Sequence, residues 1–286
     1  MRDTRIQKVL AEQGLCSRRA AEQIIKEGRV KINGRPVTVG DKMDPAKDLL
    51  TVDGNAIRIA RKSEKVYYVL HKPRGFITTT NDERGRKTVM ELMKDVPVRV
   101  YPVGRLDKDS EGLLIFTNDG DFANLLTHPS HGVSKLYRVT VRPHATEEQI
   151  IALTDGVVLD DGVKTQPSVI HVVQDEPART VLEMTIKEGQ NRQIRRMCEA
   201  VNLDVIRLRR TALGALKLGM LQPGQYRELT PSEVIALRTA ASRGKVTSEI
   251  AKNTEINATQ KKRFHGVRAA KGAVRRGERG NGGKKA

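Results

Sequence analysis

The sequence predicts an α+β protein in which a small helical domain precedes a larger domain rich in strands. Two helical patterns of apolar residues open the chain, and a β-hairpin pattern follows them. After residue 66, short apolar or alternating stretches recur with few helical patterns between them. At 286 residues, the chain is long enough for both domains to bury a core.

The N-terminal domain is expected to begin with two short helices. Residues 5–13 carry apolar side chains at helical spacing, and Gly14 can end this helix in the left-handed conformation. Ser17 is a suitable N-cap for the second helix, which Gly28 would end. The residues expected on its buried stripe are Ala20, Ala21, Ile24 and Ile25.

A hairpin is expected to follow the two helices. Asn33-Gly34 predicts a type I′ turn between strands at 30–32 and 37–39. Two helices, a hairpin and the pattern L-x-x-x-G-x-x-S-R-R, which begins at Leu10, resemble the S4 RNA-binding module over residues 3 to about 50. In such modules the start of the second helix and the hairpin face RNA, and helix N-termini with arginines suit a phosphate. The resemblance implies RNA contacts from Arg5, Lys8, Ser17, Arg18, Arg19, Lys31 and Asn33. The alternative for these residues is a solvated basic face.

The larger domain is expected to alternate strands with a few helices. The predicted strands are 67–70, 113–116, 135–141, 169–173, 180–187, 205–211 and 216–218. The predicted helices are 122–126, 146–153, one within 188–201, and one from the N-cap Thr230 to about Ala241.

A charged turn precedes the most apolar of these strands. Gly104, Arg105, Leu106 and Asp107 come shortly before the run Leu113–Phe116. A calcium loop beginning at Asp107 would need a bidentate Glu at its twelfth position, which is Asn118, so we reject calcium. Two interpretations remain: solvated turn acids, or a carboxylate nucleophile or acid/base group at Asp107 held by Arg105.

The turn also carries a family resemblance. G-R-L-D-K-D-S-E-G-L-L, beginning at Gly104, resembles the signature of the pseudouridine synthases of the RsuA/RluB/RluE/RluF branch. H-K-P-R-G from His71 and E-G-Q-N-R-Q-I-R-R-M-C-E from Glu188 also resemble that family, so the resemblance spans about Tyr67 to Arg238. It implies a catalytic domain with a central, mainly antiparallel mixed sheet. It also implies that uridine in RNA is isomerised to pseudouridine with no cofactor and no metal.

The resemblance implies roles for five residues of this chain. Asp107 would be the essential carboxylate, with Arg105 and Arg195 holding it. Tyr137 would stack on the target uracil, and Ile194 would line the nucleotide pocket. The alternatives are an ordinary strand tyrosine and a basic surface helix. The resemblance does not place chemistry at His71, for which a structural or RNA-proximal role is expected.

Composition favours a polyanionic partner. The chain has 52 Lys and Arg against 34 Asp and Glu, a net charge of +18 and a pI near 10.1. No apolar run approaches membrane-spanning length, and Cys16 and Cys198 suggest neither a disulfide framework nor a zinc site. We expect a soluble, cytoplasmic protein that needs only one copy to act.

The expected division of the chain has four parts. Residues 1–60 form the S4 domain, 61–65 a linker, 66–242 the catalytic domain, and 243–286 a basic tail that is disordered in free solution.

The expected substrate is ribosomal RNA, with 23S favoured over 16S. The stretches G-R-L-D-K-D-S and N-R-Q-I-R-R-M-C-E and the basic tail look most like the large-subunit enzymes of the B and F kinds. The alternatives are a synthase acting on 16S rRNA or tRNA, and a non-enzymatic S4-type ribosome assembly factor that only binds rRNA. A binding protein would have no need of a buried acid that repels phosphate, which favours the enzyme. A metal-dependent nuclease would need clustered acids, and the sequence has none beyond the Asp107 turn.

The C-terminal segment should add non-specific affinity for RNA. Residues 261–286 contain ten Lys or Arg and one acid, a net charge of +9. We predict that deleting them flattens the salt dependence of RNA binding, by about 0.7 in the log–log slope for every phosphate that is no longer neutralised. Turnover at saturating RNA should stay nearly unchanged in single-turnover assays. A large loss of turnover would contradict a purely electrostatic role.

Overall fold

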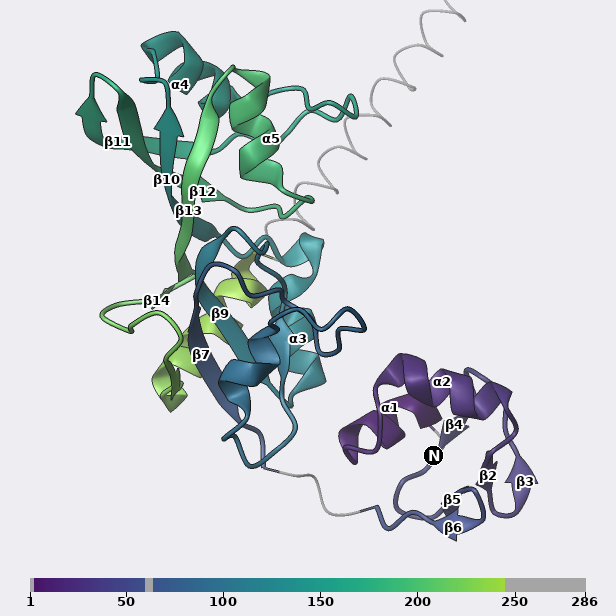
Figure 1. The fold of residues 1–286 in the computed structure, drawn as a ribbon. Helices are drawn as coiled ribbons and strands as arrows, with labels where there is room; N and C mark the ends of the chain where they lie inside the picture. Colours follow the sequence, from purple (N-terminus) through teal and green to yellow (C-terminus); the bar gives the residue numbers. More distant parts are fainter. Residues whose placement is uncertain (1–2, 60–63, 245–286) are drawn as a thin grey trace, which may run out of the picture.

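The computed structural model describes residues 3–59 and 64–244. Figure 1 shows a small N-terminal part, drawn in purple, beside a larger and taller part that contains most of the strands. The predicted α+β class is confirmed. Residues 61–63 of the predicted linker lie outside the described residues, as does most of the predicted tail, at 245–286.

The N-terminal part packs two helices against small sheets. Its helices are α1 (Ile6–Glu12) and α2 (Arg18–Lys26). Its strands are β1 (Thr4–Arg5), β2 (Val30–Ile32), β3 (Arg35–Pro36), β4 (Lys42–Met43), β5 (Leu50–Val52) and β6 (Asn55–Ala56). β1 pairs with β4, and the other four form a sheet in the order β3-β2-β5-β6. Ile6, Leu10, Ile25, Val30 and Leu50 meet in one apolar cluster between these elements.

Local signals in this part act as expected. The Ser17 hydroxyl accepts a hydrogen bond from the Ala20 N–H at 3.1 Å, and so caps α2. Asn33 and Gly34 have φ of 51° and 80°, the left-handed pair that a type I′ turn requires.

Two local expectations for this part were wrong. The second hairpin strand is Arg35–Pro36, not 37–39: it starts directly after the turn, and Pro36, opposite Lys31, is its last paired residue on the edge of the sheet. Ala20 is exposed, while Ala21 and Ile25 are buried and Ile24 is partly buried, so the core-facing stripe of α2 is narrower than expected.

The larger part is built on one sheet of nine strands. The strands are β7 (Tyr67–Lys72), β8 (Tyr101–Val103), β9 (Glu111–Thr117), β10 (Lys135–Arg142), β11 (Val169–Glu176), β12 (Arg179–Ile186), β13 (Asp204–Leu213), β14 (Leu216–Lys217) and β15 (Tyr226–Glu228). The main order is β11-β12-β10-β13-β9-β7-β15, with β14 on β13 and β8 on β9. Among the described strands only β9 and β13 pair in parallel, so the prediction of a mainly antiparallel mixed sheet is confirmed.

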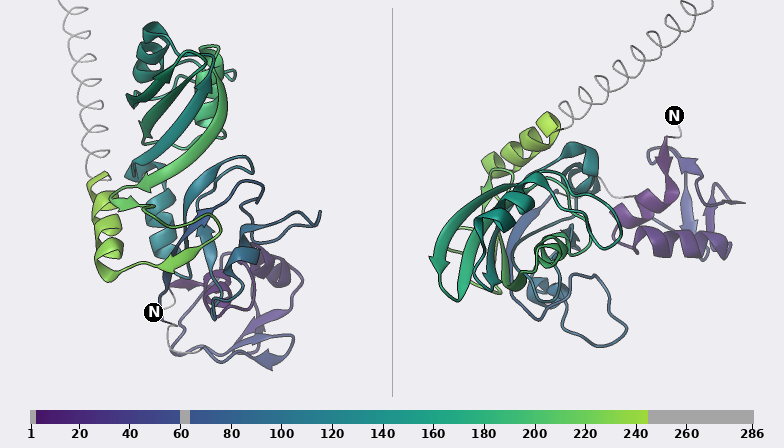
Figure 2. Two further views of the ribbon diagram at one scale, coloured as in Figure 1. Left: turned by 60° about the vertical axis from the view of Figure 1, so that its left-hand side comes forward. Right: turned by 90° about the horizontal axis from the view of Figure 1, so that it is seen from above.

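Helices cover the two faces of this sheet. They are α3 (Gly120–Thr127), α4 (Glu147–Asp155), α5 (Gln193–Ala200), the 3₁₀ turns η1 (Val89–Met93) and η2 (Pro129–His131), and a helix over 231–244. Figures 1 and 2 show α4 and α5 beside β10–β13, and α3 and the C-terminal helix beside β7 and β9. The last helix was expected to end at about Ala241 and continues to 244 within the described residues, with Leu237 and Ala241 fully buried in the cluster it shares with the sheet.

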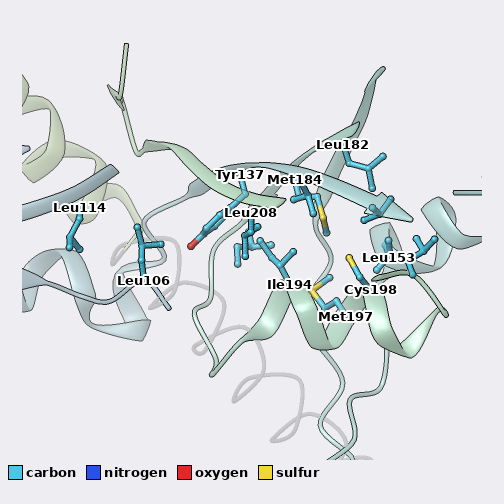
Figure 3. Packing of buried hydrophobic residues seen from close by; sticks show 14 of the residues in the cluster. Leu106, Leu114, Tyr137, Leu153, Leu182, Met184, Ile194, Met197, Cys198 and Leu208 are labelled. Carbon is cyan, nitrogen blue, oxygen red and sulfur yellow. The ribbon is translucent and has the colours of Figure 1, made fainter. Parts of the chain in front are cut away.

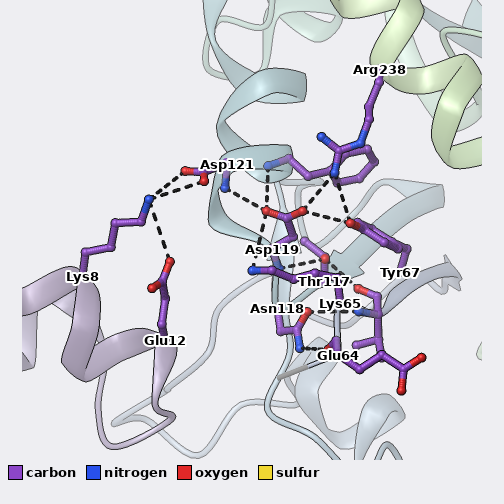
Figure 4. A network of polar contacts seen from close by, with 12 residues as sticks. Lys8, Glu12, Glu64, Lys65, Tyr67, Thr117, Asn118, Asp119, Asp121 and Arg238 are labelled. Atoms are coloured by element: carbon purple, nitrogen blue, oxygen red, sulfur yellow. Dashed lines mark hydrogen bonds and ion pairs between the residues drawn. The ribbon is translucent and has the colours of Figure 1, made fainter. Parts of the chain in front are cut away.

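A polar network fastens the lower end of the larger part. Asp119 caps α3 and accepts hydrogen bonds from the Tyr67 hydroxyl at 2.9 Å and from Arg238 at 3.0 Å (Figure 4). Lys8 of α1 lies 3.1 Å from the Asp121 carboxylate on the same helix, α3. Like the Lys8–Asp121 ion pair, a hydrogen bond from Arg99 to the Cys16 carbonyl, at 2.6 Å, joins the larger part to the N-terminal part. No helix within the two described segments is long and apolar enough to cross a membrane.

Gly112 makes the parallel pairing possible. It adopts φ of 112°, and a Cβ atom there would overlap the Arg210 carbonyl oxygen of β13. The registered pairs are Glu111 with Arg209 and Gly112 with Arg210. A side chain at position 112 would therefore push apart the two strands that join the halves of the sheet.

We predict that Gly112→Ala lowers the free energy of unfolding by about 3 kcal/mol or more, since backbone strain and overpacking add. Urea unfolding measures this. Gly219→Ala is the matched control, because Gly219 also has positive φ but nothing within 4 Å of the added atom. In the control, the free energy of unfolding should fall by only about 1–2 kcal/mol. An equal decrease in the two variants would contradict the steric argument.

Candidate active site

The turn that carries Asp107 is held through its main chain. Thr78 donates its hydroxyl hydrogen to the Leu106 carbonyl at 2.7 Å and accepts the Leu106 N–H at 3.2 Å. The Gly75 N–H bonds to the Lys108 carbonyl at 2.8 Å. The segment that begins with H-K-P-R-G thus packs against the turn and fixes its main chain. None of these hydrogen bonds uses the Asp107 side chain.

Lys72 completes this support from the interior. Its side chain is fully buried, and its ammonium donates to the carbonyls of Pro73, Asp107 and Ser110 at 3.0, 2.9 and 2.8 Å. Burial lowers the pKa of Lys72 to about 8, against the attraction of Asp107 and other acids nearby. The three protons of the ammonium meet three carbonyl oxygens, two of which belong to the turn.

Tyr137 and Ile194 lie in the same apolar cluster as Leu106, the neighbour of Asp107. Tyr137 is 8% exposed on β10, and Ile194 is 3% exposed on α5. Figure 3 shows the Tyr137 ring directed from β10 towards Leu106, with Ile194 close by. The structure therefore brings the Asp107 turn, the tyrosine and the isoleucine together from three separate stretches of the chain.

The Asp107 carboxylate is partly exposed, with 34% of its side-chain surface accessible. Arg192, at the N-terminal end of α5, approaches it most closely, with 3.8 Å between Nη1 and Oδ2. Arg192 has φ of 47°, a left-handed conformation that is uncommon for a residue with a side chain.

Arg195 and Arg105 are placed differently from expectation. Arg195 donates to the carbonyls of Val205 and Asp109, at 2.9 and 3.3 Å, and forms no direct ion pair with Asp107. These main-chain acceptors hold its guanidinium beside the turn, not on the carboxylate. Burial, and then the charge of Arg192, lowers the pKa of Arg195. Arg105 is exposed and makes no hydrogen bond or ion pair with another described residue.

The N-terminal candidates divide into two groups. Arg5, Arg18, Arg19 and Lys31 are exposed and contact no described side chain through a hydrogen bond or ion pair. The other three are engaged within the chain. Lys8 pairs with Asp121, Ser17 caps α2, and Asn33 bonds through its side chain to Asp48 and to the Leu49 N–H. RNA contact by all seven stays a prediction.

His71 belongs to the scaffold. It is 2% exposed, and its Nδ1 lies 2.7 Å from the Leu221 carbonyl. Burial lowers its pKa, which favours the neutral imidazole that donates to this carbonyl. Within the described residues, no three His, Cys, Asp or Glu side chains gather as a possible metal site.

Comparison with known proteins identifies the family. A family model described as RNA pseudouridylate synthase matches residues 66–200, and an S4 domain model matches residues 4–48. The chain is 44% identical over 243 residues to ribosomal large subunit pseudouridine synthase B of Bacillus subtilis, covering 84% of this chain and 98% of that protein. The chain belongs to the RNA pseudouridine synthase family.

Two further relatives agree. An uncharacterized RNA pseudouridine synthase of Aquifex aeolicus is 42% identical, with 83% of this chain and 94% of that protein covered. A solved structure described as a crystal structure of pseudouridylate synthase superposes with a TM-score of 0.60 at 30% identity, over 82% of this chain and all of that one. The resemblance to the synthases and to the S4 module is confirmed, and the alternative of a protein that only binds RNA loses its support.

Sequence reasoning missed several cations that shape the synthase site. Lys72 lies within H-K-P-R-G, yet nothing in that pattern indicates that its ammonium reaches carbonyls 35 and 38 residues away. Arg210 of β13 is 4% exposed and donates to the Leu113 carbonyl at 2.8 Å. Arg192 comes three residues before Arg195, and the sequence does not reveal which of the two arginines approaches the Asp107 carboxylate. The one available signal was a cation in or at the end of a strand-like stretch, as at Lys72 and Arg210.

We predict that the stability difference between wild type and Lys72→Met grows as pH rises from 8 to 10. The folded-state pKa of about 8 lies below the ordinary value of 10.5, so the unfolded chain binds more protons in this window. Stability from this group therefore rises with pH, by at most about 1.4 kcal/mol per pH unit. Urea unfolding of both proteins at pH 8, 9 and 10 measures the difference. Lys108→Met, at an exposed lysine of the same turn, is the matched control, and the same pH trend in both variants would show that burial of the Lys72 ammonium is not its cause.

Proposed function

We propose that this synthase converts a uridine of large-subunit ribosomal RNA, 23S rRNA, to pseudouridine with Asp107 as the essential carboxylate. The support for the substrate is the 44% identity over nearly the whole length of a relative named for the large ribosomal subunit. The support for Asp107 is its position: a partly exposed carboxylate on a turn that is fixed through its main chain.

The proposed reaction moves one glycosidic bond. The N1–C1′ bond of the uridine breaks, the detached uracil rotates, and a C5–C1′ bond forms, after which C5 loses its proton and N1 carries one. No atom is gained or lost, so no co-substrate is consumed. Asp107 would attack C1′, add to the base or take a ribose proton, and each of these roles needs an ionised carboxylate.

The other residues of the site would prepare the nucleotide. Extracting a uridine from its stack costs a few kcal/mol and favours loop or bulge targets. Tyr137 would offset part of this cost by stacking on the base, while Ile194 would give the pocket an apolar wall. Arg195 would fix the Asp109 carbonyl of the turn, and Arg105, which is exposed, would contact RNA phosphate.

The N-terminal module and the overall charge would hold the RNA. The exposed side chains of Arg5, Arg18, Arg19 and Lys31 offer phosphate contacts at the start of α2 and along β2. All the proposed site residues come from one chain, so we infer that a monomer acts, and a ribosomal RNA substrate would place the reaction in the cytoplasm.

Asp107→Asn is expected to reduce the single-turnover rate on 23S rRNA fragments by roughly 10²–10⁴-fold or more. Asp109→Asn is the matched control, because it removes the same charge from an exposed residue of the same turn. The control should retain most activity. Comparable losses in the two variants would mean that Asp107 has no special role.

Pseudouridine mapping of total rRNA tests the substrate. Cells without the gene should lack one modified site in 23S rRNA, which the wild-type gene restores and the Asp107→Asn gene does not. A site missing from 16S rRNA or tRNA instead would overturn the proposed substrate while leaving the enzyme class intact.

A further inference from the structure

Lys135 is a second lysine, half-buried in the structure, whose ammonium donates only to main-chain oxygens. It begins β10, two residues before Tyr137, and donates to the carbonyls of Val133, Lys187 and Glu188 at 3.2, 3.2 and 3.4 Å. Burial, with the neighbouring charge of Arg210, lowers its pKa to about 8 in spite of attraction by Glu188. Its contacts fasten the start of β10 to the loop that leaves β12.

The Glu188 carboxylate organises the loop after β12 by accepting several hydrogen bonds. Glu188 accepts the Gln166 N–H at 2.9 Å and also accepts hydrogen bonds from the side-chain amides of Gln190 and Gln193. Gln193 is 4% exposed, and its side-chain oxygen accepts the Gln190 N–H at 3.1 Å. Lys135 and this set of bonds fix the loop at both ends, from Lys187 to the first residue of α5.

Arg192 stands at the point where this loop enters α5. Its left-handed backbone, with φ of 47°, costs on the order of 1–3 kcal/mol for a residue with a side chain and persists only where surrounding contacts enforce it. The residue that follows it, Gln193, is held by Glu188. This conformation brings the Arg192 guanidinium to 3.8 Å from the Asp107 carboxylate.

We propose that Lys135 is a positioning residue for the reaction: through the Glu188–Gln193 loop, it holds Arg192 in the left-handed conformation that sets its guanidinium against Asp107. The proposal rests on the proposed role of Asp107 as the reacting carboxylate. The Lys135 ammonium donates to three carbonyls and contacts neither Asp107 nor, on this proposal, the RNA. Its effect should therefore appear in the rate of the reaction and not in the affinity for RNA.

The test is a double-mutant cycle in the single-turnover rate at saturating RNA. Lys135→Met and Arg192→Gln should each lower this rate by about 10–100-fold, the effect of a misplacement of about 1 Å in a reacting group. The RNA concentration for half-maximal rate should hardly change in Lys135→Met. The double variant should be no slower than the slower single variant, because both changes remove one interaction.

Lys187→Met is the matched control for charge. Lys187 is exposed, and its side chain makes no hydrogen bond or ion pair with another described residue, although its carbonyl accepts from Lys135. The control should leave the saturating rate unchanged. Circular dichroism and thermal unfolding check that each variant folds. If Lys135→Met does not fold, Glu188→Gln replaces it in the same cycle with Arg192→Gln.

The outcomes separate this proposal from the proposed function. Additive losses in the cycle, an unchanged rate in Lys135→Met, or a loss confined to RNA affinity would overturn the positioning role. If Asp107→Asn is inactive in the same assay, such results refute the role of Lys135 alone. If Asp107→Asn keeps its activity, the proposed role of Asp107 fails, whatever the cycle shows.

Discussion

The short parallel pairing between β9 and β13 is the constraint on which the rest of the larger part depends. Only two pairs, Glu111 with Arg209 and Gly112 with Arg210, join these strands. They connect the half of the sheet that carries the Asp107 turn to the half that carries Tyr137 and α5. Because side chains alternate between faces, a slip of one residue here would turn Leu114 and Phe116 away from the cluster they share with Tyr137.

Cations near this junction bond to carbonyl oxygens. Lys72 and Lys135 donate to carbonyls of turns and loops, and Arg210 donates to the Leu113 carbonyl within β9. Each of these bonds links segments at least 35 residues apart in the chain, so the cations fasten together parts of the fold that the sequence separates.

Between the described residues, polar contacts join the N-terminal part to the larger part at Lys8 with Asp121 and at Arg99 with the Cys16 carbonyl. An exposed ion pair is worth little and is screened by salt. Lys8 is also one of the residues expected to contact RNA. The placement of the S4 module relative to the catalytic sheet therefore rests on weak interactions, in contrast to the turn that holds Asp107.

Short local patterns in the sequence were enough to predict many of the helix starts, turns and strands of this protein. The cap at Ser17, the left-handed pair Asn33-Gly34, the apolar run that became β9 and the helix start at Thr230 all depend on residues close together in the chain. The motifs around Asp107 also indicated the family, since a signature is a local pattern.

Only the tertiary structure decided which cations serve the site. Lys72 and Lys135 reach carbonyls 35 to 53 residues away, and no local pattern encodes such acceptors. Arg192 and Arg195 are three residues apart, yet one lies against the Asp107 carboxylate and the other donates to two carbonyls. Arg192 precedes α5 in a left-handed backbone conformation and Arg195 lies within the helix, and their acceptors come from segments distant in sequence.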